Sequence, residues 1–285
     1  MHSEIECPEL ITGSSEACDL TVRFGSLRHI PVDERNPWRS FCIGEKHMLI
    51  GVEDAGRFSV REGREVIVDP APGAEPETLR LFLFGSVFGC VIHQRSLLPL
   101  HASAFLHEEE AVLVLAHSGT GKSTLAAAMK KRGRNILADD VCAVKTAHGE
   151  NPVAYPGVPQ IKLHRDSAER LGEDIGSMRK LNDEKYALPA LEHWSGHALP
   201  IKSLYILNAY DGSELKIVDP DPLEKIEALR NYTYRKGMVA KLGIGNEHLK
   251  SCETLMKSAR MRRIYRPRKS FMVEELADLI EADLP

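Results

Sequence analysis

Short hydrophobic runs separated by turn residues mark the first part of the chain, between residues 18 and 72. The runs alternate apolar and polar positions and favour β-branched residues, a pattern typical of strands. They lie at residues 20–25, 48–52 and 66–70. A segment rich in proline and glycine follows at 70–76 and favours a joint there. The pattern predicts a β-rich amino-terminal lobe over residues 1–75 and a larger lobe over residues 76–285.

Apolar residues then dominate residues 77–94, which the composition predicts to be a helix. Its most apolar part, between Leu81 and Ile92, is shorter than the roughly 20 residues needed to cross a bilayer. We therefore expect a buried helix rather than a membrane span.

From residue 98 onward, strand patterns alternate with helix patterns. Apolar runs predict one strand at 98–106 and a second at 111–115, joined by a turn. A helix rich in alanine is predicted at 123–132, and a third strand at 135–144. Further strands are predicted at 202–207 and 215–218, and helices at 222–231, 247–259 and 273–282. This alternation indicates an α/β fold class with a smaller β-rich lobe in front.

Composition narrows the partners and the compartment. The 37 Lys and Arg residues against 41 Asp and Glu give a formal net charge of -4, so no global cationic field favours nucleic acid or an anionic membrane. The six cysteines form no C-x-x-C pair, unlike the usual zinc and secreted-disulfide patterns. The acidic amino terminus lacks the basic start and apolar core of a secretion signal. We expect a cytoplasmic protein that acts on a compact, specific partner.

A phosphate-binding loop is predicted at residues 116–123, between the second strand and the alanine-rich helix. Gly121, Lys122 and Ser123 satisfy the demanding half of the pattern G-x-x-x-x-G-K-[ST]. In such a loop, backbone N–H groups surround phosphate oxygens and the following helix directs its positive end at them. Lys122 would contact the β- and γ-phosphates of ATP, and the Ser123 hydroxyl would bind Mg²⁺. The predicted nucleotide-binding residues are Ala116, His117, Ser118, Gly119, Thr120, Gly121, Lys122, Ser123 and Thr124.

Ala116 stands where the loop pattern has its first glycine. Alanine fits a tight turn only where φ stays negative, so we expect an ordinary backbone conformation at the entrance of the loop. A plainer interpretation is a glycine and serine turn that only joins a strand to a helix. The strand before the loop and the helix after it favour phosphate binding.

Two adjacent acids, Asp139 and Asp140, fall within the predicted third strand. Successive strand side chains point to opposite sides, so one carboxylate could support Mg²⁺ while the other meets an acceptor hydroxyl. A helix cap or a solvated turn would explain the pair equally well. His101, 21 residues before Lys122, is predicted on the strand next to the one that feeds the loop. Its ring could reach the phosphates there, although a single histidine is more often structural.

The order of His101, the loop at 118–123 and the two acids resembles the catalytic domain of bacterial HPr kinase/phosphorylases, which share a core with phosphoenolpyruvate carboxykinases. Asp139 follows Lys122 by 17 residues, which also fits that family. The resemblance covers residues 98–144 and implies a P-loop kinase domain of this type.

Carried over to this chain, the resemblance makes Lys122 the phosphate-binding lysine and Ser123 a magnesium ligand. It makes Asp140 the proton acceptor for a substrate serine and His101 an active-site residue. Asp139 would support the metal or the loop, and an exchange of roles between the two acids remains open.

The chain departs from HPr kinases proper after the second acid. Where that family carries a glutamate that binds metal, residues 153–160 contain none. The resemblance therefore does not extend to a third metal contact, to phosphorylase activity or to HPr as the substrate. The segments at 18–25 and 155–159 are more similar to shorter HPr-kinase-like proteins, some of which phosphorylate a serine on a lasso-peptide precursor. This branch implies a peptide or small-protein acceptor, and the family as a whole implies a hexamer.

Two sets of cationic residues are further candidates for binding anions. Arg165, Arg230 and Arg235 could each stabilise a transferring phosphate, because a guanidinium presents a fixed fork of donors. Residues 256–269 contain seven basic side chains, which form either a solvated surface or a site for an acidic peptide or phosphate.

Three functions remain open from the sequence. A kinase needs the loop and an acid on the acceptor side, and it would act on a precursor peptide or on an HPr-like phosphocarrier protein. A nucleotide switch or ATPase without an acceptor needs only the loop and one acid. A carboxykinase-like enzyme of small molecules would need further metal-binding Lys and His residues, which we cannot place in the chain.

Overall fold

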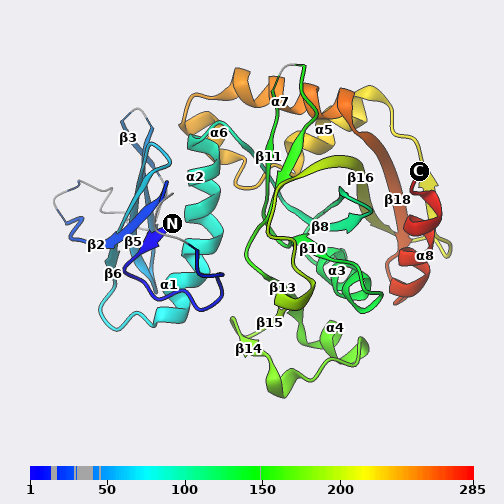
Figure 1. The fold of residues 1–285 in the computed structure, drawn as a ribbon, viewed down its shortest axis with the longest axis horizontal. Helices are drawn as coiled ribbons and strands as arrows, with labels where there is room; N and C mark the ends of the chain where they lie inside the picture. Colours follow the sequence, from blue (N-terminus) through cyan, green and yellow to red (C-terminus); the bar gives the residue numbers. More distant parts are fainter. Residues whose placement is uncertain (14–17, 29, 31–40, 45, 148) are drawn as a thin grey trace. The chain divides into compact units, whose positions relative to one another are not determined.

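The computed structural model describes residues 1–285 except 14–17, 29, 31–40, 45 and 148. The described residues form two compact units, shown in Figure 1. Unit 1 comprises Met1–Leu97 and Arg235–His248, and unit 2 comprises Leu98–Tyr234 and Leu249–Pro285. The domain boundary expected between residues 75 and 76 stays a prediction. Unit 1 continues past that point as far as Leu97.

A six-stranded sheet forms the centre of the described part of unit 1, with the order β1-β2-β6-β5-β4-β3. Its strands are β1 (His2–Ser3), β2 (Thr21–Phe24), β3 (Phe41–Gly44), β4 (His47–Val52), β5 (Gly56–Arg61) and β6 (Glu65–Pro70). Each of β3 to β6 pairs antiparallel with the next, whereas β1 and β2 join the sheet in parallel. The three runs predicted as strands therefore lie in this sheet, as β2, β4 and β6.

One helical segment with a π-helical centre follows the sheet of unit 1. It consists of α1 (Pro76–Phe82), η2 (Leu83–Val87) and α2 (Phe88–Gln94), which confirms the helix predicted at 77–94. Gln94 ties its end to the sheet, because its Nε2 donates to the carbonyl of Val60 at 3.1 Å and its Oε1 accepts from the N–H of Gly63 at 2.7 Å. The short helix α6 (Gly237–Lys241) contacts α2 and so belongs to unit 1.

A larger sheet organises unit 2 around β16 (Leu199–Tyr210), its longest described strand. In the described residues the order is β10-β8-β9-β16-β12-β11-β7, and β18 also pairs with β16. The other strands are β7 (Leu98–Leu100), β8 (Ala102–His107), β9 (Glu110–Ala116), β10 (Ile136–Ala138), β11 (Cys142–Lys145), β12 (Val153–Tyr155), β17 (Lys216–Val218) and β18 (Arg260–Pro267). Because β9 and β18 both run parallel to β16, the carboxyl ends of these three strands lie at the same edge of the sheet.

The two faces of this sheet carry separate hydrophobic cores. Along β9, Val112 and Val114 belong to one core and Leu113 and Leu115 to the other, because successive strand side chains point to opposite faces. Helices α3 (Lys122–Lys131) and α8 (Val273–Asp283) contribute to the first core, and α5 (Pro222–Asn231) and α7 (Gly245–Ser258) to the second. Burial on both faces explains why β9 is a continuous apolar run.

Arg132 connects α8 to the end of α3. Its guanidinium lies 2.7 Å from a carboxylate oxygen of Glu274, 2.7 Å from one of Asp278 and 2.9 Å from one of Glu281. These three acids lie on one side of α8 at helical spacing, so a single cation bonds to three turns of the helix. The contacts hold α8 against α3 in unit 2.

A small sheet with the order β13-β15-β14 completes unit 2, and the sequence patterns did not predict it. Its strands are β13 (Gln160–His164), β14 (Arg179–Lys180) and β15 (Lys185–Pro189). Helix α4 (Arg165–Arg170) follows β13, and the 3₁₀ turns η3 (Ile175–Ser177) and η4 (Leu191–His193) lie nearby in the sequence. Ile161 and Leu163 of β13 enter the same core as α3, which places this sheet beside the phosphate loop's helix.

Two of the predicted strands are each interrupted. The run at 98–106 divides into β7 and β8 around His101, and the run at 135–144 divides into β10 and β11. The pieces have different partners, since β7 pairs with β11 whereas β8 pairs with β9 and β10. The prediction of two continuous strands was therefore wrong, because a run of apolar residues does not show where a strand changes partner.

Candidate active site

The loop between β9 and α3 has the backbone shape of a phosphate cradle. Gly119 and Gly121 have positive φ angles of 79° and 104°, and Gly121 directly precedes the first helical residue, Lys122. Glycine adopts such angles without strain, so the N–H groups at the start of α3 can surround an anion. Ala116 is the buried last residue of β9 and has no positive φ, as expected for alanine at the entrance of the loop.

Lys122, Ser123 and Asp139 meet next to this loop. The Ser123 hydroxyl donates to Oδ1 of Asp139 at 3.0 Å, and Nζ of Lys122 lies 3.9 Å from the same oxygen. The Asp139 carboxylate is fully buried and also accepts hydrogen bonds from the hydroxyl of Ser103 and the backbone N–H of Lys162. These bonds fix one orientation of the carboxylate beside the loop.

A Mg²⁺ ion fits Ser123 and Asp139. Hydroxyl and carboxylate oxygens suit Mg²⁺, which usually binds through one or two carboxylates, phosphate oxygens and water rather than in a complete protein cage. The described part of the chain has no group of three or more His, Cys, Asp or Glu side chains that could hold a metal. The two residues that could hold the ion, together with the phosphates of a nucleotide, are Ser123 and Asp139.

Asp140 forms a second cluster with Lys162 and His101. Nζ of Lys162 lies 2.8 Å from Oδ2 of Asp140, and Nδ1 of His101 lies 2.9 Å from its backbone oxygen and 3.3 Å from Oδ1. A carbonyl oxygen only accepts, so Nδ1 carries a proton and a neutral ring presents Nε2 as an acceptor. The side chains of His101 and Asp140 are 23% and 20% exposed, which leaves both within reach of a substrate.

The charges in this cluster set its protonation states. Burial raises the pKa of Asp140, but the ammonium groups of Lys162 and Lys122 outweigh burial and hold that pKa well below its usual range. Burial lowers the pKa of Lys162, and the Asp140 carboxylate more than compensates, so the net shift is upward. Burial, together with the charge of Lys122, lowers the pKa of His101. Near pH 7 the cluster therefore contains a carboxylate, an ammonium group and a neutral imidazole.

The structure corrects the expected positions of the histidine and the acids. His101 does not lie on a strand paired with β9 but between β7 and β8. Its backbone N–H donates there to the carbonyl of Tyr232 at 2.7 Å. Asp139 and Asp140 do not alternate along a strand either, because they follow the end of β10 and Asp140 has a positive φ of 75°. The two strand breaks direct His101 and Asp140 into the same cavity.

Arg266 lies beside the loop, although no sequence pattern singled it out from its basic neighbours. It stands near the carboxyl end of β18, at the sheet edge that carries the phosphate loop. Its Nε donates to the carbonyl oxygen of Thr120 at 2.6 Å. Burial and the nearby Arg268 lower its pKa, and within the described residues no carboxylate contributes to that shift. The guanidinium is therefore available to phosphate oxygens.

The three arginines nominated from the sequence do not line this cavity. Arg165 pairs with Glu169 on α4 at 3.8 Å, and its side chain is 59% exposed. Arg230 and Arg235 are exposed as well, and Arg235 belongs to unit 1.

Basic side chains at 256–269 form two groups. Some pair with acidic side chains, and others line the cavity. Arg260 pairs with Asp283, Arg262 with Asp219 and Arg263 with Glu224. Past these residues, the end of β18 and the following loop contribute Arg266, Arg268 and Lys269 to the cavity. The sequence could not make this division, because only the register of β18 shows which basic side chains reach the loop.

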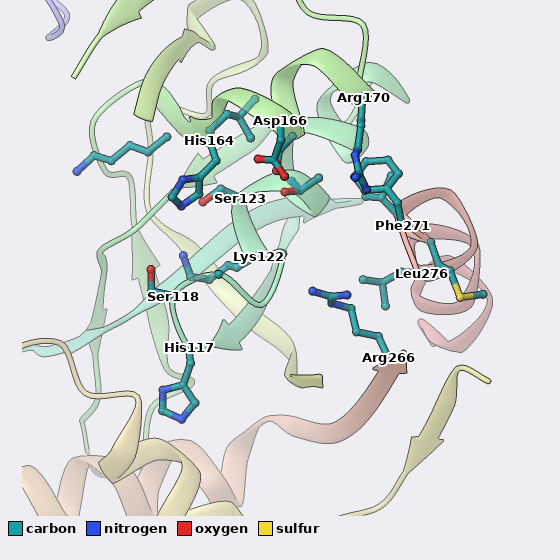
Figure 2. Close-up of a pocket in the computed structure, with 18 of the residues that line it drawn as sticks. His117, Ser118, Lys122, Ser123, His164, Asp166, Arg170, Arg266, Phe271 and Leu276 are labelled. Atoms are coloured by element: carbon teal, nitrogen blue, oxygen red, sulfur yellow. The ribbon is translucent and has the colours of Figure 1, made fainter. Parts of the chain in front are cut away.

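A cavity of about 320 Å³ in unit 2 brings these residues together. Its walls include His101, His117, Ser118, Gly119, Gly121, Lys122, Ser123, Thr124, Asp140 and Lys162. Figure 2 shows Lys122 and Ser123 near the middle of this view, with Arg266, Phe271 and Leu276 to one side. Thr120, Ala116 and Asp139 are buried behind the lining. Seven of the nine predicted nucleotide-binding residues and the Asp140 cluster thus border one space.

No helix in the described segments is long and apolar enough to cross a membrane. The chain matches no family model and no curated protein. Among solved structures it is similar to the HPr(Ser) kinase/phosphatase from Coxiella burnetii, with 17% sequence identity and a TM-score of 0.34 over 65% of this chain and 91% of that chain. A similarity this low leaves the geometry of the site as the basis for its function.

Proposed function

We propose that this chain is an ATP-dependent kinase that transfers the γ-phosphate of ATP to a serine hydroxyl on a peptide or small protein. The division of the site into two carboxylate clusters supports this best. Asp139 contacts Ser123 and Lys122 of the loop, whereas Asp140 faces the cavity with Lys162 and His101. Nucleotide binding needs only the first cluster, so the second favours a reaction with another substrate.

The residues of the loop would bind the triphosphate and balance its charge. The N–H groups at the start of α3 and Nζ of Lys122 would contact the β- and γ-phosphates, and Ser123 and Asp139 would hold Mg²⁺. When bound, the ion neutralises phosphate charge. Arg266, which is bonded to the loop at Thr120, contributes a second fixed cation for the charge that develops as ADP leaves.

In the transfer step one bond forms and one breaks. The acceptor hydroxyl oxygen bonds to the γ-phosphorus, and the bond from that phosphorus to the β–γ bridging oxygen breaks, so the electron pair leaves with ADP. Asp140 accepts the hydrogen bond of the hydroxyl and takes its proton late in the reaction, because its low pKa makes it a weak base. Lys162 and His101 hold the Asp140 carboxylate in position for this contact.

The proposed acceptor is a ribosomal precursor peptide of the lasso type, and an HPr-like phosphocarrier protein is the alternative. The segment that follows the second acid supports the first of these. Residues 153–160 contain no Asp or Glu, so they cannot supply the metal-binding glutamate of HPr kinases proper. A P-loop ATPase or nucleotide switch remains the candidate from another class, because the Asp139 cluster alone would serve it.

The test is incubation with γ-labelled ATP, Mg²⁺ and the short peptide or HPr-like protein encoded beside this chain. We expect label on an acceptor serine, and Asp140→Asn should lower the transfer rate by about 100-fold while ATP still binds. Asp183→Asn is the control, since this acid is 99% exposed and its ion pair in the described structure is with the exposed Lys180. Free phosphate released at an undiminished rate by Asp140→Asn, with no labelled acceptor, would identify an ATPase instead.

A further inference from the structure

Most of the apolar side chains that line the cavity come from the start of α8, at the end of the cavity that Arg170 also lines. The apolar lining residues are Leu163, Phe271, Met272, Val273 and Leu276. Val273 and Leu276 are buried at the start of α8, whereas the preceding Phe271 keeps 40% of its surface exposed. An exposed aromatic side chain within a cavity offers a surface that a flat apolar group can cover.

Arg170 holds the Phe271 ring from one side. Its guanidinium carbon lies 5.2 Å from the ring centroid, within the range of a cation–π contact. Arg170 is the last residue of α4 and Phe271 precedes α8, so the contact joins two separate elements of unit 2. Figure 2 shows the two side chains grouped together at this end of the cavity. The contact therefore favours one orientation of the ring.

The strand order places Phe271 on the other side of the loop from Asp140. Asp140 follows β10, which lies two strands from β9 in one direction, and Phe271 follows β18, which lies two strands from β9 in the other. The phosphate loop follows β9 itself and so lies between them. A nucleoside triphosphate that crosses the loop with its γ-phosphate towards Asp140 directs its nucleoside towards Phe271.

We infer that Phe271 stacks against the nucleobase of the bound nucleotide and that Arg170 holds the ring in place for it. The inference rests on the proposed function, because it assigns the base end of the same site. A base that stacks on an aromatic ring gains affinity independently of its phosphates. An apolar acceptor side chain is the other possible occupant of this surface, but the strand order puts the acceptor's acid, Asp140, on the far side of the loop.

Isothermal titration with ADP and with tripolyphosphate separates the base from the phosphates. We expect Phe271→Ala to weaken ADP binding by about tenfold, as for the loss of one base–aromatic stack, and to leave tripolyphosphate binding unchanged. Phe271→Trp should retain the ADP affinity because it keeps an aromatic face. Leu223→Ala removes a large apolar side chain that is 65% exposed outside the cavity, and as the matched control it should change neither affinity.

Several outcomes would overturn the inference without affecting the proposed function. Phe271→Ala could weaken ADP and tripolyphosphate equally, or change neither, and then the ring does not contact the base. A raised KM for the acceptor with unchanged ADP affinity would assign the surface to the acceptor. If the wild-type protein binds neither ADP nor tripolyphosphate, the proposed function fails first. Equal thermal midpoints of the ligand-free variants would show that the exposed substitution leaves the fold intact.

Discussion

At the residue scale, the cations of the site differ in what neutralises them. Lys122 lies near the buried Asp139, and Lys162 bonds directly to Asp140. Arg266 instead bonds to a neutral group, the carbonyl oxygen of Thr120. A guanidinium beside a phosphate loop that has no carboxylate bound to it in the described structure keeps its full charge for a ligand. Arg266 is therefore the arginine we assign to the transferring phosphate, in place of the three nominated from the sequence.

Replacing Arg266 tests that assignment. We expect Arg266→Ala to lower kcat by about 100-fold, as when one fixed donor to a transition-state charge is lost, with a smaller loss for Arg266→Lys. Arg165→Ala is the control, because Arg165 is 59% exposed and lies outside the cavity. Steady-state kinetics with ATP and the unphosphorylated acceptor provide the measurement. Similar rates for Arg266→Ala and Arg165→Ala would contradict the role.

His101 should make the free energy of unfolding depend on pH. Burial and the charge of Lys122 lower its pKa below the ordinary 6.5, so the native protein resists a proton that the unfolded chain accepts. As the pH falls below 6.5, the free energy of unfolding should therefore decrease, by at most about 1.4 kcal/mol per pH unit, until the native pKa is reached. Urea unfolding between pH 8 and pH 5 would show this decrease in the wild type. The His101→Gln variant should lack the part of this decrease that comes from His101. An identical dependence of the free energy of unfolding on pH in both proteins would contradict the lowered pKa of His101.

At the element scale, local signals predicted helices well and interrupted strands poorly. Helix α5 begins and ends where the sequence pattern placed it, because Asp221 and Glu224 form a capping box and Pro222 occupies the first turn. No comparable local signal marks the break at Asp140, where the chain takes a left-handed conformation that aspartate adopts more readily than most residues. The strand prediction therefore missed the breaks that direct His101 and Asp140 into the cavity.

The small sheet shows a second limit of local patterns. In β13, Ile161 and Leu163 are buried while Lys162 and His164 between and after them are less so, an alternation that the sequence does contain. That signal could have identified the strand. It could not have shown that Lys162 reaches Asp140, because that contact depends on how β13 packs beside α3. The position of the loop between a strand and a helix could be predicted because its residues lie within eight consecutive positions, whereas the Asp140 cluster joins residues far apart in the sequence.

At the scale of the whole molecule, the lining of the cavity comes from distant parts of the sequence within unit 2. The loop at 117–124 meets residues 162–170 and residues 266–276. Parallel pairing of β9, β16 and β18 brings residues 266–276 to the loop, since it places the ends of these strands at one sheet edge. Packing of β13 against α3 brings residues 162–170 there. All of the lining residues belong to unit 2 and none to unit 1 in the described structure. Nucleotide binding should therefore stabilise unit 2 first.

Amide hydrogen exchange with and without ADP tests this last expectation. At 100 times Kd, a ligand stabilises the bound state by about 2.7 kcal/mol, so exchange that requires release of ADP should slow by about 100-fold. We expect this slowing at 116–124, 160–170 and 266–276, and unchanged exchange in the unit 1 strands β4, β5 and β6. Lys122→Ala at the same ADP concentration should show no slowing, because it removes a phosphate contact. Equal slowing in β4 to β6 would contradict the expectation, and it would mean that the nucleotide orders unit 1 as strongly as the unit that holds it.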